Sequence, residues 1–207
     1  MTPKFSAAGL IYKRILDLAG GVVGGIVLFL MYPFVGAAIK YESPGPVLFK
    51  QKRMGQNGRI FNLYKFRSMY QDAEQRKQEL MEKNLMNGAM FKLKDARRIT
   101  RVGRWLRKTS LDEFPQFLNV LKGEMSLVGT RPPTLDEVEE YKPEHLKRIS
   151  AKPGITGLWQ VSGRNKITDF EEVVKLDCEY IDGWRFFDDI KIISKTVLAV
   201  LQRKGAL

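Results

Sequence analysis

Residues 18–39, LAGGVVGGIVLFLMYPFVGAAI, form a stretch of 22 residues without a charged side chain. A helix of about 20 apolar residues is long enough to span a bilayer. Pro33 lies inside the stretch, where it breaks or kinks a helix. Lys13 and Arg14 precede the stretch and Lys40 follows it, and positive flanks favour the same side of a membrane for both ends. We therefore predict a re-entrant helix that bends at Pro33, with a simple transmembrane helix as the alternative.

The composition of the 207-residue chain limits what it can be. With 44% hydrophobic and 28% charged residues it is not a disordered protein, and it is long enough to bury a core. The single Cys178 excludes an internal disulfide framework and is expected to serve packing, and the lone His145 is expected at the surface or at a helix end. Carboxylates are therefore the expected ligands of any metal, which favours magnesium or manganese over zinc.

A strongly basic segment precedes two adjacent carboxylates, Asp112 and Glu113. The net charge of +12 allows nucleic acid, an anionic membrane surface or phosphorylated small molecules as partners. A cationic field lowers carboxylate pKa values and gathers phosphorylated ligands, so the pair indicates work on phosphates. A structural alternative is that Ser110-x-x-Glu113 is a capping box and that Pro115 opens a helix. Eight cations lie between positions 91 and 110: Lys92, Lys94, Arg97, Arg98, Arg101, Arg104, Arg107 and Lys108.

The remaining pattern predicts short elements around this segment. Residues 47–49 and 59–66 are expected to be strands joined by an Asn57-Gly58 turn, and residues 71–90 a helix followed by a loop. Helical spacing runs from residue 99 to Gly123. Residues 190–201 form an amphipathic helix that either closes the core or lies on the bilayer surface. The paired glycines at 20–21 and 24–25 permit close helix contact in lipid.

Six linked motifs occur in order along nearly the whole chain. They are Lys13-Arg14-x-x-Asp17, Ser43-Pro44-Gly45-Pro46-Val47-x-Phe49-x-Gln51-x-Arg53-x-Gly55, Tyr64-Lys65-Phe66-Arg67-Ser68-Met69, Val102-Gly103-x-x-Leu106-Arg107-Lys108-Thr109-Ser110-Leu111-Asp112-Glu113-x-Pro115-Gln116, Asn119-Val120-x-x-Gly123-x-Met125-Ser126-x-Val128-Gly129-x-Arg131-Pro132, and Pro153-Gly154-Ile155-Thr156-Gly157-x-x-Gln160-Val161-x-Gly163-Arg164. Together they resemble the bacterial sugar transferase family, the monotopic polyprenyl-phosphate phosphoglycosyl transferases. The C-terminal residues look like the catalytic portion of the larger members that initiate exopolysaccharide, capsule and O-antigen (lipopolysaccharide) synthesis.

The resemblance implies a fold and a location. The fold is a mainly helical α+β structure, with a re-entrant membrane helix broken at Pro33, interfacial amphipathic helices and a small β element around a cytoplasmic active site. Residues 1–41 would be the membrane-associated segment and residues 42–207 the catalytic domain. The protein would lie at the cytoplasmic face of the bacterial inner membrane among membrane lipids, without nucleic acid, and as a homodimer if it self-associates.

The resemblance also implies an activity and its residues. A sugar 1-phosphate would pass from a UDP-sugar to undecaprenyl phosphate with release of UMP. Asp112 would be the nucleophile that forms a covalent phosphosugar intermediate, Glu113 would assist, and Asp112 would also hold Mg²⁺, with Mn²⁺ as a substitute. Lys65, Arg107 and Arg131 carry over as phosphate- and nucleotide-contacting residues. Arg67, Gln160 and Arg164 match family motifs as further substrate-binding residues.

The sequence departs from the family pattern at two positions. Thr130 stands where the family usually has proline before Arg131, which puts the rigidity of that loop in question. Tyr32 stands where serine often precedes the helix-breaking proline. The alternative function is a membrane-anchored nucleic-acid- or anion-binding protein without catalysis, in which the basic run with Trp105 follows a phosphate backbone. Asp112 and Glu113 would repel such a backbone.

Overall fold

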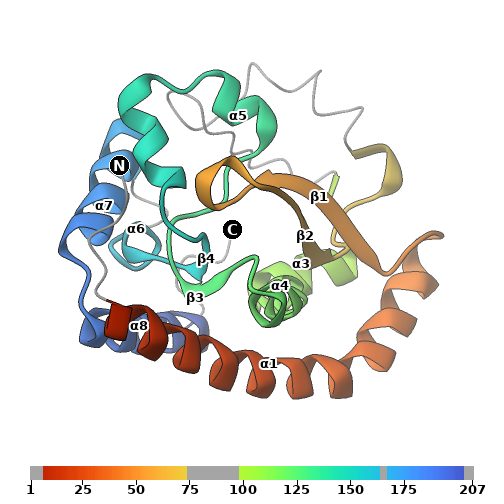
Figure 1. Ribbon diagram of the computed structural model, residues 1–207. Coiled ribbons are helices and arrows are strands. Elements are labelled where there is room, and N and C mark those ends of the chain that lie inside the picture. The colour runs from red at the N-terminus through yellow and green to blue at the C-terminus, as the bar shows by residue number, and fades with distance from the viewer. Residues whose placement is uncertain (1–6, 74–97, 164–166, 203–207) are drawn as a thin grey trace.

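The computed structural model describes residues 7–73, 98–163 and 167–202 (Figure 1). Helices predominate, and two small two-stranded sheets lie among them, so the prediction of a mainly helical α+β fold is confirmed. The elements are α1 (Ala7–Glu42), β1 (Leu48–Met54), η1 (Gln56–Gly58), β2 (Ile60–Phe66), η2 (Gln71–Ala73), α3 (Arg101–Lys108), η5 (Leu111–Glu113), α4 (Gln116–Lys122), β3 (Ser126–Val128), α5 (Leu135–Glu139), η6 (Pro143–Ile149), β4 (Gly154–Thr156), α6 (Leu158–Val161), α7 (Phe170–Gly183) and α8 (Phe186–Leu201).

Helix α1 contains the apolar stretch and continues through Pro33 to Glu42. The expected break of the helix at this proline is not seen, although Figure 1 shows the C-terminal part of α1 turning up toward the hairpin. Val35 and Ile39, which follow the proline, are buried in a cluster with Phe66 and Leu106. This packing stabilises the helix after Pro33 and so offsets the backbone hydrogen bond that proline cannot make. The re-entrant path through a membrane stays a prediction.

The glycines of α1 pack against α4 and β3 of the same chain. A Cβ atom on Gly24 would overlap the ring of Phe117, and one on Gly21 would lie 2.9 Å from Leu121. A Cβ on Gly20 would meet Leu127 at 2.5 Å. These small residues therefore serve close packing within the protein, and their use for helix contact in lipid stays a prediction.

Two of the cations counted as a membrane flank are structural. The Lys13 ammonium is buried and donates to Asp189 at 2.6 Å, to Tyr180 at 3.0 Å and to the Val128 carbonyl at 2.9 Å. Arg14 donates to the carbonyls of Val120 and Leu121 at the C-terminal end of α4. Their positive charges are therefore used inside the fold, which weakens the topology argument drawn from this flank.

Strands β1 and β2 form the expected antiparallel hairpin, with Leu48 opposite Phe66 and Met54 opposite Ile60. The first strand is longer than the sequence indicated. The turn holds Asn57 and Gly58 at φ of 54° and 80°, values that these two residue types tolerate best. The second sheet pairs β3 and β4 in parallel.

The helical spacing from residue 99 to Gly123 does not correspond to one continuous helix. Ser110 has a φ of 56°, in the left-handed region, and divides the segment into α3, the 3-10 turn η5 and α4. An apolar pattern with helical spacing continues through such a turn, so spacing alone does not reveal the left-handed residue, although Pro115 marks the start of α4. Most of residues 71–90, predicted as a helix and a loop, lie outside the described residues.

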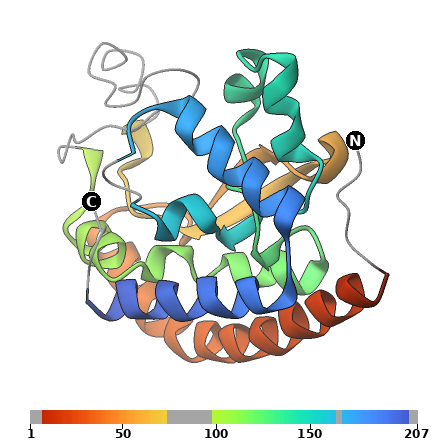
Figure 2. The ribbon, with the colours of Figure 1, turned by 90° about the vertical axis from the view of Figure 1, so that its left-hand side faces the viewer.

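Helices α1 and α8 lie side by side along one face of the molecule (Figures 1 and 2). Of the two uses left open for the C-terminal helix, core closure is seen, because Asp189 and Ile192 are buried. Its other side chains leave a large apolar surface next to that of α1. Within the described residues, α1 is the one helix long and apolar enough to cross a membrane. The exposed apolar side chains of the two helices include Ile11, Ile15, Val23, Ile26, Phe29, Leu30, Phe34, Phe187, Val197, Leu198 and Leu201.

Candidate active site

Asp112 and Glu113 lie in the short turn η5 between α3 and α4. Leu111 and Phe114, on either side of the pair, pack against the core cluster that contains Phe66 and Leu106. The Ser110 side chain makes no capping hydrogen bond, so the capping-box alternative is wrong, whereas Pro115 directly precedes α4 as expected. The pair is thus held by a left-handed turn and by packing, next to the N-terminus of a helix, which favours anionic groups.

Strand β2 brings a predicted binding residue to the pair. The Lys65 ammonium lies 2.9 Å from a carboxylate oxygen of Glu113, and both side chains are partly exposed. Asp112 is 7% exposed. Arg107, in the last turn of α3, donates from Nε to the Ser68 hydroxyl at 2.9 Å, which ties α3 to the chain just after β2. Lys65 and Glu113, which are 48 positions apart in the sequence, are therefore brought together as the predictions require.

Arg67 has a different environment from the other predicted binding residues. Its guanidinium is buried and donates to the backbone carbonyls of Ser43, at 2.6 Å, and Pro44. Burial also lowers its pKa. In this structure Arg67 holds the Ser43–Pro44 turn that follows α1, which is a support for the hairpin.

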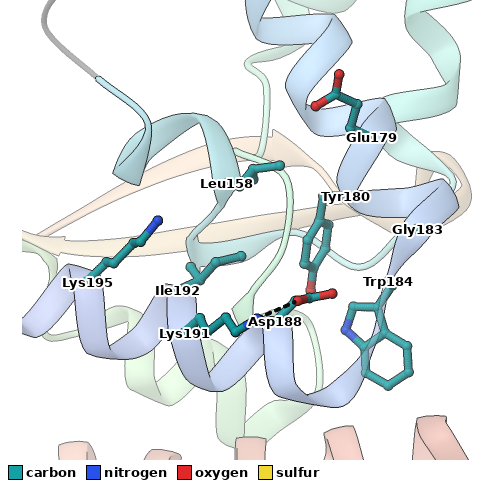
Figure 3. Close-up of a pocket in the computed structure, with 9 residues that line it drawn as sticks. All are labelled: Leu158, Glu179, Tyr180, Gly183, Trp184, Asp188, Lys191, Ile192 and Lys195. Atoms are coloured by element: carbon teal, nitrogen blue, oxygen red, sulfur yellow. Dashed lines mark ion pairs between the residues drawn. The ribbon is translucent and has the colours of Figure 1, made fainter.

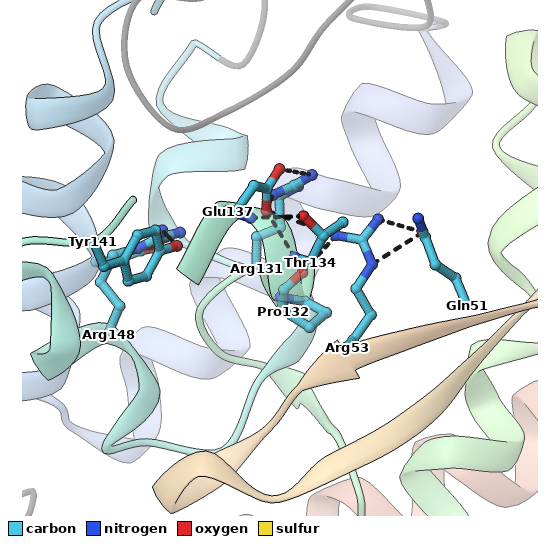
Figure 4. A network of polar contacts seen from close by, with 9 residues as sticks. Gln51, Arg53, Arg131, Pro132, Thr134, Glu137, Tyr141 and Arg148 are labelled. Carbon is cyan, nitrogen blue, oxygen red and sulfur yellow. Dashed lines mark hydrogen bonds and ion pairs between the residues drawn. The ribbon is translucent and has the colours of Figure 1, made fainter. Parts of the chain in front are cut away.

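Arg131 belongs to a polar network next to strand β1 of the hairpin (Figure 4). It donates through two nitrogens to the Glu137 carboxylate, at 2.9 and 3.1 Å, and Glu137 is only 5% exposed. Arg53, on β1, lies 3.9 Å from Glu137 and donates to the Pro132 carbonyl at 2.9 Å. Burial and the positive charge of Arg131 lower the pKa of Arg53 to about 10. The network fixes the loop that carries Arg131 to strand β1.

The loop at Thr130 is tied in place without the proline that the family usually has there. The Thr130 hydroxyl donates to the Arg148 carbonyl at 2.9 Å, and the Thr130 carbonyl accepts from the Gly154 amide at 2.9 Å. Gln160 donates to the Ile155 carbonyl at 3.3 Å in the segment after β4. Arg164, the last predicted binding residue, lies outside the described residues.

A model of the family described as "Bacterial sugar transferase" matches residues 8–203. The chain belongs to the bacterial sugar transferase family. It is 56% identical over 197 residues to "Galactosyl transferase CpsE" of Streptococcus agalactiae serotype III, covering 95% of this chain and 44% of that protein. It is 48% identical over 198 residues to "Undecaprenyl-phosphate galactose phosphotransferase" of Salmonella typhimurium, covering 94% and 41%. The chain spans less than half the length of these two relatives.

A shorter relative matches over most of its length. "Exopolysaccharide production protein ExoY" of Sinorhizobium fredii is 37% identical over 202 residues, which cover 96% of this chain and 89% of that protein.

The carboxylates of this sugar transferase fit a magnesium ion that is bound mainly by substrate. Among the described residues no three His, Cys, Asp or Glu side chains gather as a protein-only metal site. Mg²⁺ is commonly held by one or two carboxylates and by substrate phosphates. Asp112, with Glu113 beside it, supplies that number of carboxylates.

Two residues that hold the Arg131 loop were not singled out from the sequence, Arg53 and Glu137. Arg53 belongs to the motif that begins at Ser43, and Glu137 is the last residue of a Thr134-x-x-Glu137 capping box that is present in the structure. The capping box can be recognised in the sequence, but the pairing of Glu137 with Arg131 is seen only in the structure.

The prediction that Cys178 serves packing is confirmed, because Cys178 packs against a core cluster. His145 lies near the start of η6 but is buried, with Nε2 3.2 Å from Glu171, so a surface position is wrong.

A cavity of about 220 Å³ lies away from these residues, between α7 and α8 (Figure 3). Trp184 and Tyr180 line it, together with an Asp188–Lys191 ion pair of 3.8 Å. None of the predicted catalytic or binding residues lines this cavity. The candidate site therefore consists of the residues of η5, β2 and the Arg131 loop, away from this cavity.

Proposed function

We propose that this protein transfers a sugar 1-phosphate from a UDP-sugar to undecaprenyl phosphate and releases UMP, as the first membrane step of exopolysaccharide, capsule or O-antigen synthesis. One observation carries the proposal, namely the placement of adjacent Asp112 and Glu113 beside Lys65 in a member of the sugar transferase family. The names of the relatives support a lipid-phosphate acceptor and a polysaccharide pathway.

The proposed reaction has two displacements at one phosphorus atom. An Asp112 carboxylate oxygen attacks the sugar-bearing phosphorus, the bond to the bridging oxygen breaks, and UMP leaves with that electron pair. An oxygen of undecaprenyl phosphate then attacks the same phosphorus and Asp112 leaves as a carboxylate. Lys65 and Arg131 neutralise phosphate charge, and Glu113 accepts a proton from the acceptor phosphate when it arrives as a monoanion. Mg²⁺ bound by Asp112 and substrate oxygens would neutralise the diphosphate.

The membrane location follows from the apolar surface of α1 and α8. Contiguous exposed apolar side chains of this extent mark a membrane or protein contact. We place this surface in the cytoplasmic leaflet of the bacterial inner membrane, with α1 re-entrant, so that Asp112 meets the acceptor phosphate at the headgroups.

The test of the activity is release of UMP from a panel of UDP-sugars by the detergent-solubilised protein with undecaprenyl phosphate and Mg²⁺. Wild type should turn over one or more donors, and its Asp112 peptide should carry a hexose-phosphate mass adduct when acceptor is omitted. Asp112→Asn should be inactive but folded, because an amide cannot form the acyl phosphate. Full activity of this variant would refute the nucleophile. EDTA should abolish turnover and Mg²⁺ or Mn²⁺ restore it; undiminished turnover in EDTA would refute the metal requirement.

The topology has its own test. In a Cys178→Ser background, cysteines at Thr2 and at exposed Lys52 should both be protected from an impermeant thiol reagent in intact cells. Labelling at position 2 but not at 52 would show that α1 spans the membrane.

A further inference from the structure

One face of α3 carries three cations and a tryptophan. Arg101, Arg104, Trp105 and Lys108 are all exposed, at spacings that place them together on one side of a helix. Trp105 is 53% exposed, an unusual state for the largest apolar side chain. We call these four residues the α3 face.

The α3 face is held rigidly by the opposite side of the helix. Leu106 is fully buried, and a Cβ atom on Gly103 would overlap the backbone of Ser68, so α3 lies directly on the end of the hairpin. The Glu42 carboxylate, at the end of α1, accepts from the amides of Arg101 and Val102 at 2.5 and 2.7 Å. The α3 face therefore has a fixed position relative to the end of the apolar helix.

Among the residues that the structure describes, the cations of the α3 face have no acidic partners. Across the described ranges, with their gaps, no ion pair or side-chain hydrogen bond involves Arg101, Arg104 or Lys108. Elsewhere in the same ranges, long cationic side chains such as Lys13 and Arg67 are engaged within the fold. The Glu42 carboxylate accepts from the backbone amides of Arg101 and Val102 and so caps the helix.

We infer that the α3 face binds the anionic headgroups of membrane phospholipids, with Trp105 at the boundary between headgroups and acyl chains. Basic clusters next to a membrane helix attract anionic lipids, and tryptophan favours that boundary. The exposed Phe34 and Tyr41 extend the apolar surface of α1 toward its Glu42 end, where α3 is attached. The inference rests on the proposed membrane location and not on the transfer reaction.

A nucleic acid is the less suitable occupant of the α3 face. The α3 face adjoins the apolar surface of α1 at its Glu42 end, and this surface suits the boundary of a bilayer better than a solvated phosphate backbone. Asp112 follows Lys108 by four positions, so lipid binding by the α3 face would set the height of Asp112 above the bilayer.

The experiment uses the full chain in nanodiscs, with acyl chains brominated near the headgroup as quenchers. The emission of Trp105 is obtained as wild type minus Trp105→Phe. In nanodiscs with phosphatidylglycerol this difference signal should be quenched, and in phosphatidylcholine alone it should not. An Arg101→Gln/Arg104→Gln/Lys108→Gln variant should be quenched less than wild type at the same phosphatidylglycerol content, because each cation contributes about five-fold in affinity for an anionic surface. A control with equal charge loss at exposed sites, Lys52→Gln/Arg59→Gln/Lys175→Gln, should behave as wild type.

Three results would overturn the inference. Equal emission loss in wild type and Trp105→Phe would show that Trp105 does not reach the lipid. Equal quenching in both lipid mixtures would show that charge does not drive the contact. A shift of the Trp105 signal by a single-stranded oligonucleotide, without a response to phosphatidylglycerol, would assign the α3 face to nucleic acid. UMP release measured on the same samples reports separately on the proposed function.

Discussion

Replacing Asp189 should lower the thermal stability of the protein, because Asp189 is the ion-pair partner of the buried Lys13. Asp189→Leu leaves the Lys13 ammonium buried with only the Tyr180 hydroxyl and the Val128 carbonyl as acceptors. Removing one member of a buried ion pair costs about 3–5 kcal/mol. In a chain of this size 1 kcal/mol shifts Tm by about 2–4 °C, so the expected loss is about 6–20 °C.

The chain contains a matched control for this effect. Lys147 and Asp182 are also 2.6 Å apart, but their side chains are 28% and 62% exposed, against 9% and 1% for Lys13 and Asp189. Because an exposed pair contributes about 0–1 kcal/mol, Asp182→Leu should lower Tm by less than about 4 °C. The difference in Tm loss between Asp189→Leu and Asp182→Leu therefore measures the effect of burial on two ion pairs of the same length.

Thermal unfolding of the protein in one detergent, followed by circular dichroism, checks these values. A Lys13→Met/Asp189→Leu variant should recover at least half of the loss, because neither member of this pair is left buried without the other, and Tyr180 keeps the Val128 carbonyl as acceptor. A double variant that melts at the sum of the two single losses would refute the reasoning. So would equal Tm changes in Asp189→Leu and Asp182→Leu.

Three further predictions concern the packing, the turn and the network. Gly24→Ala should destabilise the protein by about 1–3 kcal/mol, since the new methyl overlaps Phe117. Gly183→Ala, which meets nothing within 4 Å, should be neutral or stabilising in the same thermal unfolding experiment. Ser110→Gly should be more stable than Ser110→Ala by about 1 kcal/mol in urea unfolding, because only glycine adopts a φ of 56° without strain; equal stabilities would contradict the left-handed turn. Burial opposes ionisation of Glu137, but Arg131 and Arg53 outweigh it and hold the pKa of Glu137 below its ordinary 4.5. The ionised Glu137 then stabilises the protein above pH 4.5, and this stabilisation is lost as the pH falls through the lowered pKa of Glu137. The difference in Tm between wild type and Glu137→Gln should therefore become smaller in acid. A difference that stays constant from pH 6 to pH 3.5 would exclude this coupling.

Local patterns predicted much of the fold. Alternation around Asn57-Gly58 was enough for the hairpin, because both residues tolerate the left-handed turn. The length of the apolar stretch was enough for α1, and the amphipathic spacing of the C-terminal residues was enough for α8. The adjacent carboxylates needed no fold to bring them together, since they are neighbours in the chain.

Other features depend on contacts between distant positions, which spacing does not encode. The left-handed Ser110 is compatible with an uninterrupted helical pattern, so only the packing of Leu111 and Phe114 on the core reveals it. The partnership of Lys65 and Glu113 arises because β2 lies against η5.

The charges show the same division between sequence and structure. By itself the sequence determined how many cations flank the apolar stretch and that a carboxylate pair follows a basic segment. Only the tertiary structure decided which charges are used inside the fold, as Lys13 is by Asp189, and which are left outward, as on α3. The reason is physical: a buried charge is stable only beside a partner, and that partner can lie 176 positions away.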